Sequence, residues 1–177
     1  MAAQDIAMAV SRVESVLRRR PEAALHDDPP ASVRWEGGLR MVASHASGRQ
    51  AVTDMPAELG GSGDQVSPGW LLRAALGSCA ATCIAVAAAR DGITLDALEV
   101  EAGSRSDARG MLGLPDADGQ PVDPGPRDLA MRVRIAARGV PAERLRALVV
   151  AAQGCAPVSA ALRNALPMEL HIEVDER

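Results

Sequence analysis

One segment, Pro68–Arg90, constrains the fold more than any other part of the chain. Ser67 can cap a helix N-terminus and Pro68 suits the first helical position, so these two residues predict where a helix begins. Most positions of the segment hold Ala or another small residue, which makes the helix apolar nearly all round. Such a helix has to be enclosed by the rest of the protein. The apolar run 74–89 is too short and too weakly apolar for a bilayer, so we predict a buried core helix and no membrane contact.

Hydrophobic periodicity predicts further helices and strands around this core helix. The expected helices are 5–20, which is amphipathic, 141–153 and 158–165. The expected strands are 32–44 and 50–55, which form a hairpin with its turn at 45–49, then 95–101, 129–135 and a closing strand at 168–174. Residues 107–127 are rich in Gly, Pro and Asp and predict a long excursion between two strands. The order indicates an α+β fold, with an N-terminal helix and connector over 1–30 and one domain over 31–177.

Composition limits the partners of this 177-residue chain. The net charge of −4 argues against nucleic acid, because phosphate binding needs a basic face. Two Trp are the sole aromatic residues, since Phe and Tyr are absent. An aromatic-poor core buries little area per side chain, so association into a homodimer is a natural way to bury more.

The cysteine count and the N-terminus indicate the compartment. Three cysteines are too few and too scattered for a secreted disulfide framework, and they suit a reducing environment. Asp5, Arg12 and Glu14 interrupt the first apolar residues, so no signal peptide is expected. We therefore expect a cytoplasmic protein.

The cysteines are the candidate reactive groups. Cys79 and Cys83 lie on one stripe of the core helix, one turn apart. A reactive Cys79 would need a nearby cation, because it lies eleven residues past Pro68 and the helix dipole fades after the first turn. Arg40 or Arg49 of the hairpin could supply the cation, and without one Cys79 is a small buried hydrophobe.

The other two cysteines allow two interpretations each. A disulfide between Cys79 and Cys83 would be strained, because their Cβ vectors run nearly parallel, and core packing is the better interpretation of Cys83. Cys155 follows Gly154 at a helix end, where a backbone adjustment could aim it at Cys79; it is either a resolving thiol or a structural residue.

No cofactor or metal pattern stands out in the sequence. The three histidines are scattered and no C-x₂-C pair supports a zinc site. The glycines of 60–63 are not followed by Gly-Lys-Ser/Thr, so they do not form a phosphate loop. We therefore expect no cofactor.

Two motifs carry a resemblance to a known family. The first is MPAELGG at 55–61 followed by SPGWLLRAALGSC at 67–79, and the second is CAPVS at 155–159. Together they resemble the OsmC/Ohr family, in a branch with an N-terminal helical extension and the segment 104–114. The resemblance implies antiparallel sheets wrapped around a long central helix in an intertwined dimer. It also implies a pocket at the dimer interface, where two Cys, an Arg and a Glu reduce hydroperoxides and an external dithiol resets the enzyme.

The family's site residues carry over unevenly onto this chain. Cys79 matches the reactive Cys, and Arg40 lies nearest to the family's Arg. Gly69 and Trp70 stand where the Glu is expected. The second Cys belongs directly before Pro-Val, but that slot is Ala156 and Cys155 lies one residue earlier.

These residues lead to three functional hypotheses. The first is a thiol-dependent hydroperoxide reductase with Cys79 as nucleophile, Cys155 as resolving thiol and Arg40 as stabiliser of the thiolate. The alternative is a non-catalytic OsmC-fold dimer that binds a small apolar ligand or a protein partner in a pocket lined by Trp70 and Cys83. A third is a one-Cys enzyme, in which an external thiol reduces oxidised Cys79 directly.

Overall fold

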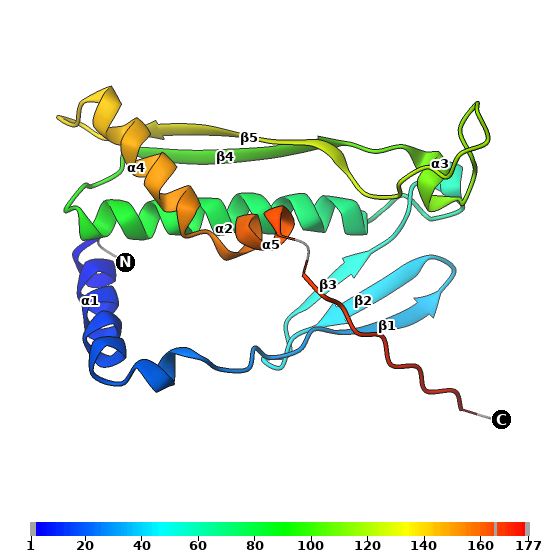
Figure 1. Cartoon of the computed structure of the whole chain (residues 1–177), viewed down its shortest axis with the longest axis horizontal. Coiled ribbons are helices and arrows are strands. Elements are labelled where there is room, and N and C mark those ends of the chain that lie inside the picture. The colour runs from blue at the N-terminus through cyan, green and yellow to red at the C-terminus, as the bar shows by residue number, and fades with distance from the viewer. Residues whose placement is uncertain (1–2, 165, 176–177) are drawn as a thin grey trace.

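Helix α2 (Pro68–Arg90) forms the axis of the computed structural model, which describes residues 3–164 and 166–175 (Figure 1). The Ser67 hydroxyl accepts a hydrogen bond from the Trp70 amide at 3.2 Å, so the predicted cap is confirmed. The helix ends at Arg90, and Gly92 follows with a φ of +67°, which a residue with a side chain rarely adopts. Local sequence signals therefore set both ends of this helix.

A long two-stranded antiparallel ribbon covers one side of α2. It pairs β4 (Ala97–Arg105) with β5 (Arg127–Ala136), and their apolar side chains alternate with exposed polar ones. The ribbon packs on the helix at Gly77, where a Cβ would be in ordinary van der Waals contact with the Val100 carbonyl oxygen at 3.5 Å. The excursion between the two strands contains a short helix, α3 (Ala108–Met111), which the sequence did not predict.

Helices α4 (Ala142–Gly154) and α5 (Pro157–Arg163) cover another side of α2. The core lies between α2, the ribbon and α4 and consists of small and medium-sized side chains: Ile84, Ala88, Ile93, Leu145, Leu148 and Ala152. Among the described residues, Ile84 is the one large side chain that is fully buried. The core is therefore thin, as the lack of aromatic residues predicts.

The N-terminal sheet has three strands, where the sequence predicted two. Its strands are β1 (Ser32–Gly37), β2 (Arg40–Ser44) and β3 (Gln50–Thr53), antiparallel in that order. The prediction of a single strand over 32–44 was wrong because Gly37 and Gly38 both take positive φ and turn the chain back on itself. The turn predicted at 45–49 is confirmed by the bond from the His45 amide to the Arg49 carbonyl.

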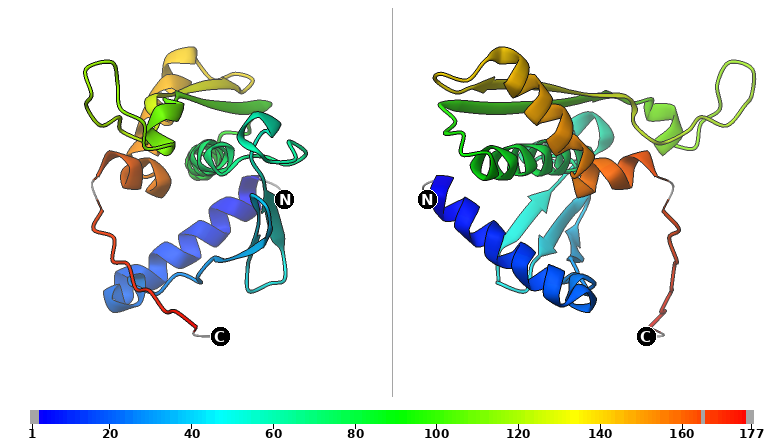
Figure 2. Two further views of the ribbon diagram at one scale, coloured as in Figure 1. Left: turned by 90° about the vertical axis from the view of Figure 1, so that its right-hand side faces the viewer. Right: turned by 60° about the vertical axis from the view of Figure 1, so that its left-hand side comes forward.

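Helix α1 (Ala3–Arg19) crosses the C-terminal end of α2, as the two views in Figure 2 show. Its Glu14 forms an ion pair with Arg90 at 2.8 Å. A short 3₁₀ helix (Pro21–Ala24) and an extended connector then lead to β1.

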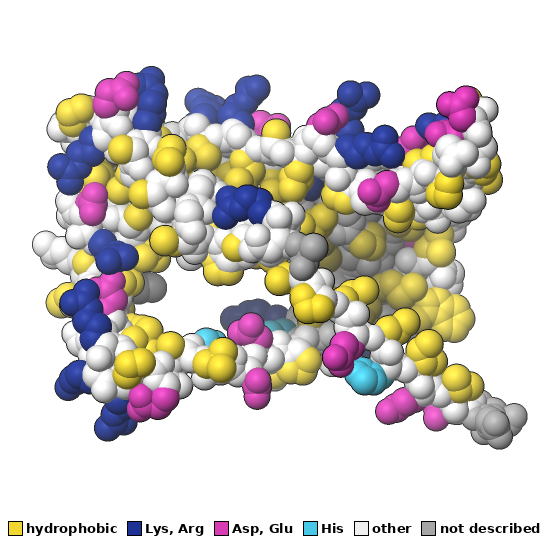
Figure 3. Space-filling view, in the orientation of Figure 1, with side chains coloured by type: hydrophobic (Ala, Val, Ile, Leu, Met, Phe, Trp, Pro, Cys, Tyr) yellow, Lys and Arg dark blue, Asp and Glu magenta, His cyan; other side chains and the backbone are white. Residues whose placement is uncertain are grey.

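The closing strand predicted at 168–174 is not formed in the single chain, so that prediction was wrong for the protomer. Residues 166–175 run as an extended, solvent-exposed segment beyond α5 (Figures 1 and 3). The apolar side chains at every second position are between 64% and 90% exposed: Leu166, Met168, Leu170, Ile172 and Val174. The alternation is that of a half-buried strand, but no strand of the described chain pairs with it.

By length and composition, α2 could cross a membrane, and the bent pair α4–α5 meets the same criterion together. The prediction based on 74–89 alone was too strict, because the whole helix has 23 residues. In the structure α2 packs against β4, α1, α4 and α5, as the core helix of a globular domain does.

Candidate functional site

Three free thiols gather where α2 passes the junction of α4 and α5. Cys79 and Cys83 lie one turn apart on α2, and Cys155 is the C-terminal cap of α4. The Cys83 thiol points at the Cys155 carbonyl oxygen, with 3.8 Å between sulfur and oxygen. Burial raises the pKa of the Cys83 thiol, and the neighbouring Cys79 and Cys155 raise it further. The cluster joins segments 72 residues apart, which no local pattern could reveal.

A cavity of about 560 Å³ opens beside this cluster, between α2 and α4. Its wall is mostly apolar and contains two of the three thiols, Cys83 and Cys155. Arg90 and Asp91 supply charged groups at the C-terminal end of α2. The remaining lining residues are Thr82, Val86, Ala87, Leu148, Ala151 and Ala152.

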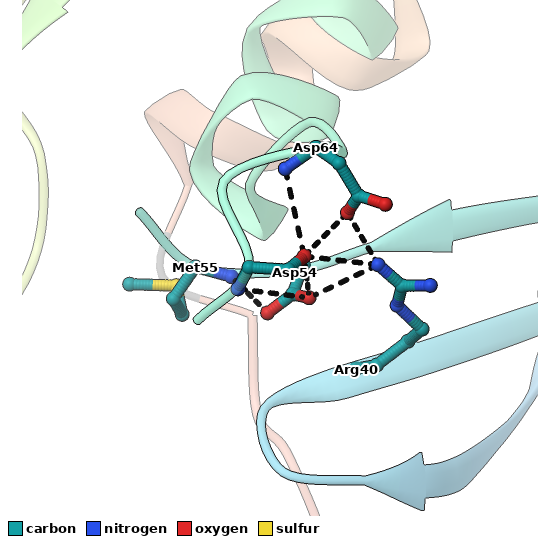
Figure 4. A network of polar contacts seen from close by, with 5 residues as sticks. Arg40, Asp54, Met55 and Asp64 are labelled. Carbon is teal, nitrogen blue, oxygen red and sulfur yellow. Dashed lines mark hydrogen bonds and ion pairs between the residues drawn. The ribbon is translucent and has the colours of Figure 1, made fainter. Parts of the chain in front are cut away.

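Arg40 belongs to a separate polar network near the N-terminal end of α2 (Figure 4). Its guanidinium donates to the Ser62 hydroxyl at 2.9 Å and forms ion pairs with Asp54 at 3.4 Å and with Asp64. Among the described residues, no hydrogen bond joins Arg40 to a cysteine. Its role as stabiliser of the Cys79 thiolate stays a prediction.

Asp54 is the centre of this network and is only 4% exposed. Its carboxylate accepts hydrogen bonds from the Ser62 hydroxyl at 2.6 Å and from the Met55 amide at 2.7 Å. The Ser62 hydroxyl is the main reason that the pKa of Asp54 lies below its usual range, and the backbone amides and Arg40 lower it further. Ser62 and Arg40 lower the pKa of Asp64 in the same way.

This network also explains the Gly-Gly part of the first motif. Gly60 has a φ of +87°, and a Cβ on Gly61 would lie 1.8 Å from the Met55 carbonyl oxygen. The loop can therefore close around Asp54 only if residue 61 has no side chain.

We expect Asp54→Asn to lower the melting temperature at pH 7 by on the order of 5 °C, because a neutral amide cannot replace a buried carboxylate that accepts from amides, a hydroxyl and Arg40. The native pKa of Asp54 is lowered, so the unfolded state binds more protons as the pH falls. The stabilisation is therefore complete above the ordinary Asp pKa and is lost progressively as the pH falls from there through the lower native pKa of Asp54. Thermal melts between pH 7 and 3 should show the native protein and the Asp54→Asn variant converging in acid. A constant difference across this range would contradict the role of the charge.

Trp70 lines a second cavity, of about 530 Å³, together with Asp54, Ser62 and Arg73. It lies 13 positions before Cys83 on the same helix, which corresponds to about 20 Å along the axis. Within one chain the two residues predicted to share a pocket therefore line different cavities. Their meeting across a dimer interface stays a prediction.

The sequence singled out the three cysteines and Arg40, but it did not show which of them meet. The contact of Cys83 with Cys155 and the carboxylates around Arg40 were missed. One signal was available: Asp54 directly follows strand 50–53 and precedes the MPAELGG motif, where a buried acid would need partners.

Comparison with family models identifies the family of the chain. The model for OsmC-like protein matches residues 61–171, and the chain belongs to this family. No curated protein matches the chain at a significant level.

Solved structures of the same fold support this assignment. An osmotic stress induced and detoxification response protein from Psychrobacter arcticus is similar with a TM-score of 0.57 and 22% identity, over 77% of this chain and 90% of that one. An organic hydroperoxide resistance protein OsmC from Legionella pneumophila gives 0.56 and 21%, over 78% and 91%. An OsmC-like protein from Mycoplasma pneumoniae gives 0.64 and 14%, over 78% and 89%. At these identities the similarity establishes the α+β OsmC fold alone.

Proposed function

We propose that this protein is a cytoplasmic, thiol-dependent reductase of organic hydroperoxides in which Cys79 is the nucleophile. The observation that carries the proposal is the gathering of three free thiols at the junction of α2 with α4 and α5. Two thiols within reach of each other can reduce one peroxide bond and store the two oxidising equivalents as a disulfide. The name of the similar Legionella protein, an organic hydroperoxide resistance protein, is consistent with this chemistry.

The proposed reaction begins with attack of the Cys79 thiolate on the peroxide. An S–O bond forms, the O–O bond breaks, and the alcohol leaves after taking up a proton. A second thiol then attacks the sulfenic sulfur, so that a disulfide forms and the oxygen leaves as water. An external dithiol reduces the disulfide and returns both cysteines to the thiol form.

The raised pKa of Cys83 supports the choice of Cys79 as the first nucleophile. Burial raises the pKa of Cys83, which lowers the fraction of thiolate at this position and slows its attack on a peroxide from solution. Exchange with a disulfide held next to it needs only that small fraction. Cys155 is exposed at a helix end, which suits a resolving thiol better than a nucleophile held in a fixed geometry.

We further propose that the working form is a homodimer. The ribbon β4–β5 and the sheet β1–β3 each have unpaired edges, and the apolar side chains of 166–175 stand in solvent. Figure 3 shows an open space between the α2 layer and the connector with the C-terminal segment, consistent with a protomer shaped to receive a second copy. Adding an exposed strand to a sheet edge satisfies the backbone and buries the apolar face together.

The test of the reductase proposal is the consumption of an organic hydroperoxide by the reduced protein with a dithiol in excess. We expect multiple turnovers that scale with protein concentration, and none after the thiols have been alkylated. A protein that consumes no hydroperoxide above the dithiol background would overturn the proposal.

The cavity walls favour a second candidate function, the binding of a small apolar ligand. Val86, Ala87 and Leu148 give the cavity beside the thiols an apolar wall, and Trp70 borders the other cavity. Saturable binding of an apolar fluorescent probe, together with the absence of hydroperoxide turnover, would favour this candidate over the reductase.

A further inference from the structure

The proposed two-thiol reaction uses Cys79 and Cys155 and gives Cys83 no role. Cys83 lies between the other two thiols, one turn after Cys79 on α2 and next to the Cys155 carbonyl at 3.8 Å. Of the residues that the structure describes, Cys83 and Cys155 are the two thiols in the wall of the 560 Å³ cavity. The pair that a reductant could reach through this cavity is therefore Cys83 with Cys155.

Helix geometry decides which disulfides are accessible. Cys79 and Cys83 are four residues apart inside a regular helix, so their Cβ vectors run nearly parallel and a direct bond between them is strained. Cys155 caps α4 with φ −105° and ψ 5°, and Ala156 is extended with φ −83° and ψ 111°. The chain leaves the helix here, so the direction of the Cys155 side chain is not fixed by helix geometry, whereas Cys79 and Cys83 are held side by side on α2.

We propose that Cys83 is a relay thiol, which takes the disulfide over from Cys79 so that the oxidised state comes to rest as Cys83–Cys155. The pairing is argued from the contact of the Cys83 sulfur with the Cys155 backbone carbonyl and from the cavity that both residues line, while the transfer from Cys79 rests on the proposed hydroperoxide chemistry.

The relay balances without any further oxidant. The hydroperoxide oxidises Cys79 to the sulfenic acid, and Cys155 displaces the oxygen as water to form Cys79–Cys155. The Cys83 thiolate then attacks the Cys155 sulfur, the new S–S bond forms, and Cys79 leaves as a thiolate. One proton leaves Cys83 and one is available to Cys79, so the exchange is neutral. A dithiol that enters the cavity reduces Cys83–Cys155 while Cys79 is already able to react again.

The pairing is tested without peroxide, with diamide as the oxidant and the Cys79→Ser protein as the substrate. We expect the loss of about two thiols and a disulfide between the tryptic peptides 74–90 and 147–163, which then hold one cysteine each. The Cys79→Ser/Cys83→Ser protein is the matched control and should form no intramolecular disulfide. A Cys79→Ser protein that keeps both thiols free, at a diamide dose that oxidises the native protein, overturns the pairing.

The relay is tested with one equivalent of organic hydroperoxide on the reduced native protein. Fragment ions that separate residues 79 and 83 should place the bond at Cys83, with Cys79 free to alkylate. In the Cys83→Ser protein we expect Cys79–Cys155 to persist and reduction by dithiol to slow several-fold. Because Cys83 packs against the core cluster, Cys83→Ala is made beside it to preserve folding. Cys79–Cys155 as the final product in the native protein overturns the relay. If the native protein does not react with the hydroperoxide but forms Cys83–Cys155 with diamide, the proposed reductase function is overturned and the pairing of the two thiols is supported.

Discussion

The Cys79→Ser protein is expected to consume organic hydroperoxide at the rate of the dithiol alone, a loss of about 10²-fold or more from the native rate. Serine is close to cysteine in size, so α2 should keep its packing. Its hydroxyl does not ionise at neutral pH, however, and the nucleophile for the peroxide bond is lost. The measurement is the initial rate of hydroperoxide loss under excess dithiol, together with circular dichroism to confirm folding.

The control for this variant is Ser78→Ala, one position earlier. Ser78 is exposed and its hydroxyl donates to the Ala75 carbonyl of its own helix at 3.2 Å, so its loss should leave the rate at the native value. Native activity in the Cys79→Ser protein would show that another thiol is the nucleophile. Equal losses in both variants would point to damage to α2 rather than to chemistry.

Truncation after Asn164 is expected to convert the protein from dimers into monomers and to lower the melting temperature strongly. The truncation removes the apolar face of 166–175, whose side chains are at least 64% exposed in one chain and gain burial only from another. Light scattering coupled to size-exclusion chromatography measures the mass, and a dilution series shows whether the native mass depends on concentration.

A matched pair of full-length variants separates the strand from mere chain length. Leu170→Asp with Ile172→Asp places charge on the apolar face and should dissociate the dimer as truncation does. Glu169→Ala with Glu173→Ala alters the opposite face and should leave the mass unchanged. If the truncated protein keeps the native mass, the C-terminal segment has no part in assembly.

The sequence predicts those features of the fold that depend on neighbouring residues, such as helix ends and the alternation of a strand. Ser67, Pro68 and Gly92 mark the ends of α2, and alternation within β5 marks a half-buried strand. The two wrong strand predictions have physical causes of different kinds. The Gly37–Gly38 turn was read as part of a strand because its flanks continue the same pattern, and 168–174 has strand alternation without a partner in its own chain.

The sequence identified the candidate residues of the site, but it did not show which of them contact one another. A motif identified Cys79, but the approach of Cys83 to Cys155 depends on how α4 crosses α2. Likewise the sequence did not show that the fold places two carboxylates beside Arg40. Contacts between distant segments are set by packing, and a single sequence does not display them.

The ion pair between Glu14 and Arg90 affects which reductants can approach the cavity beside the thiols. Arg90 forms part of the cavity wall and pairs with Glu14 of α1, so the N-terminal helix sets the charge at one part of the cavity that a reductant would enter. An anionic thiol therefore meets a compensated guanidinium there rather than a bare one. Without the Glu14 carboxylate the same wall would carry Arg90 without this ion pair, and the preference between anionic and neutral reductants would change.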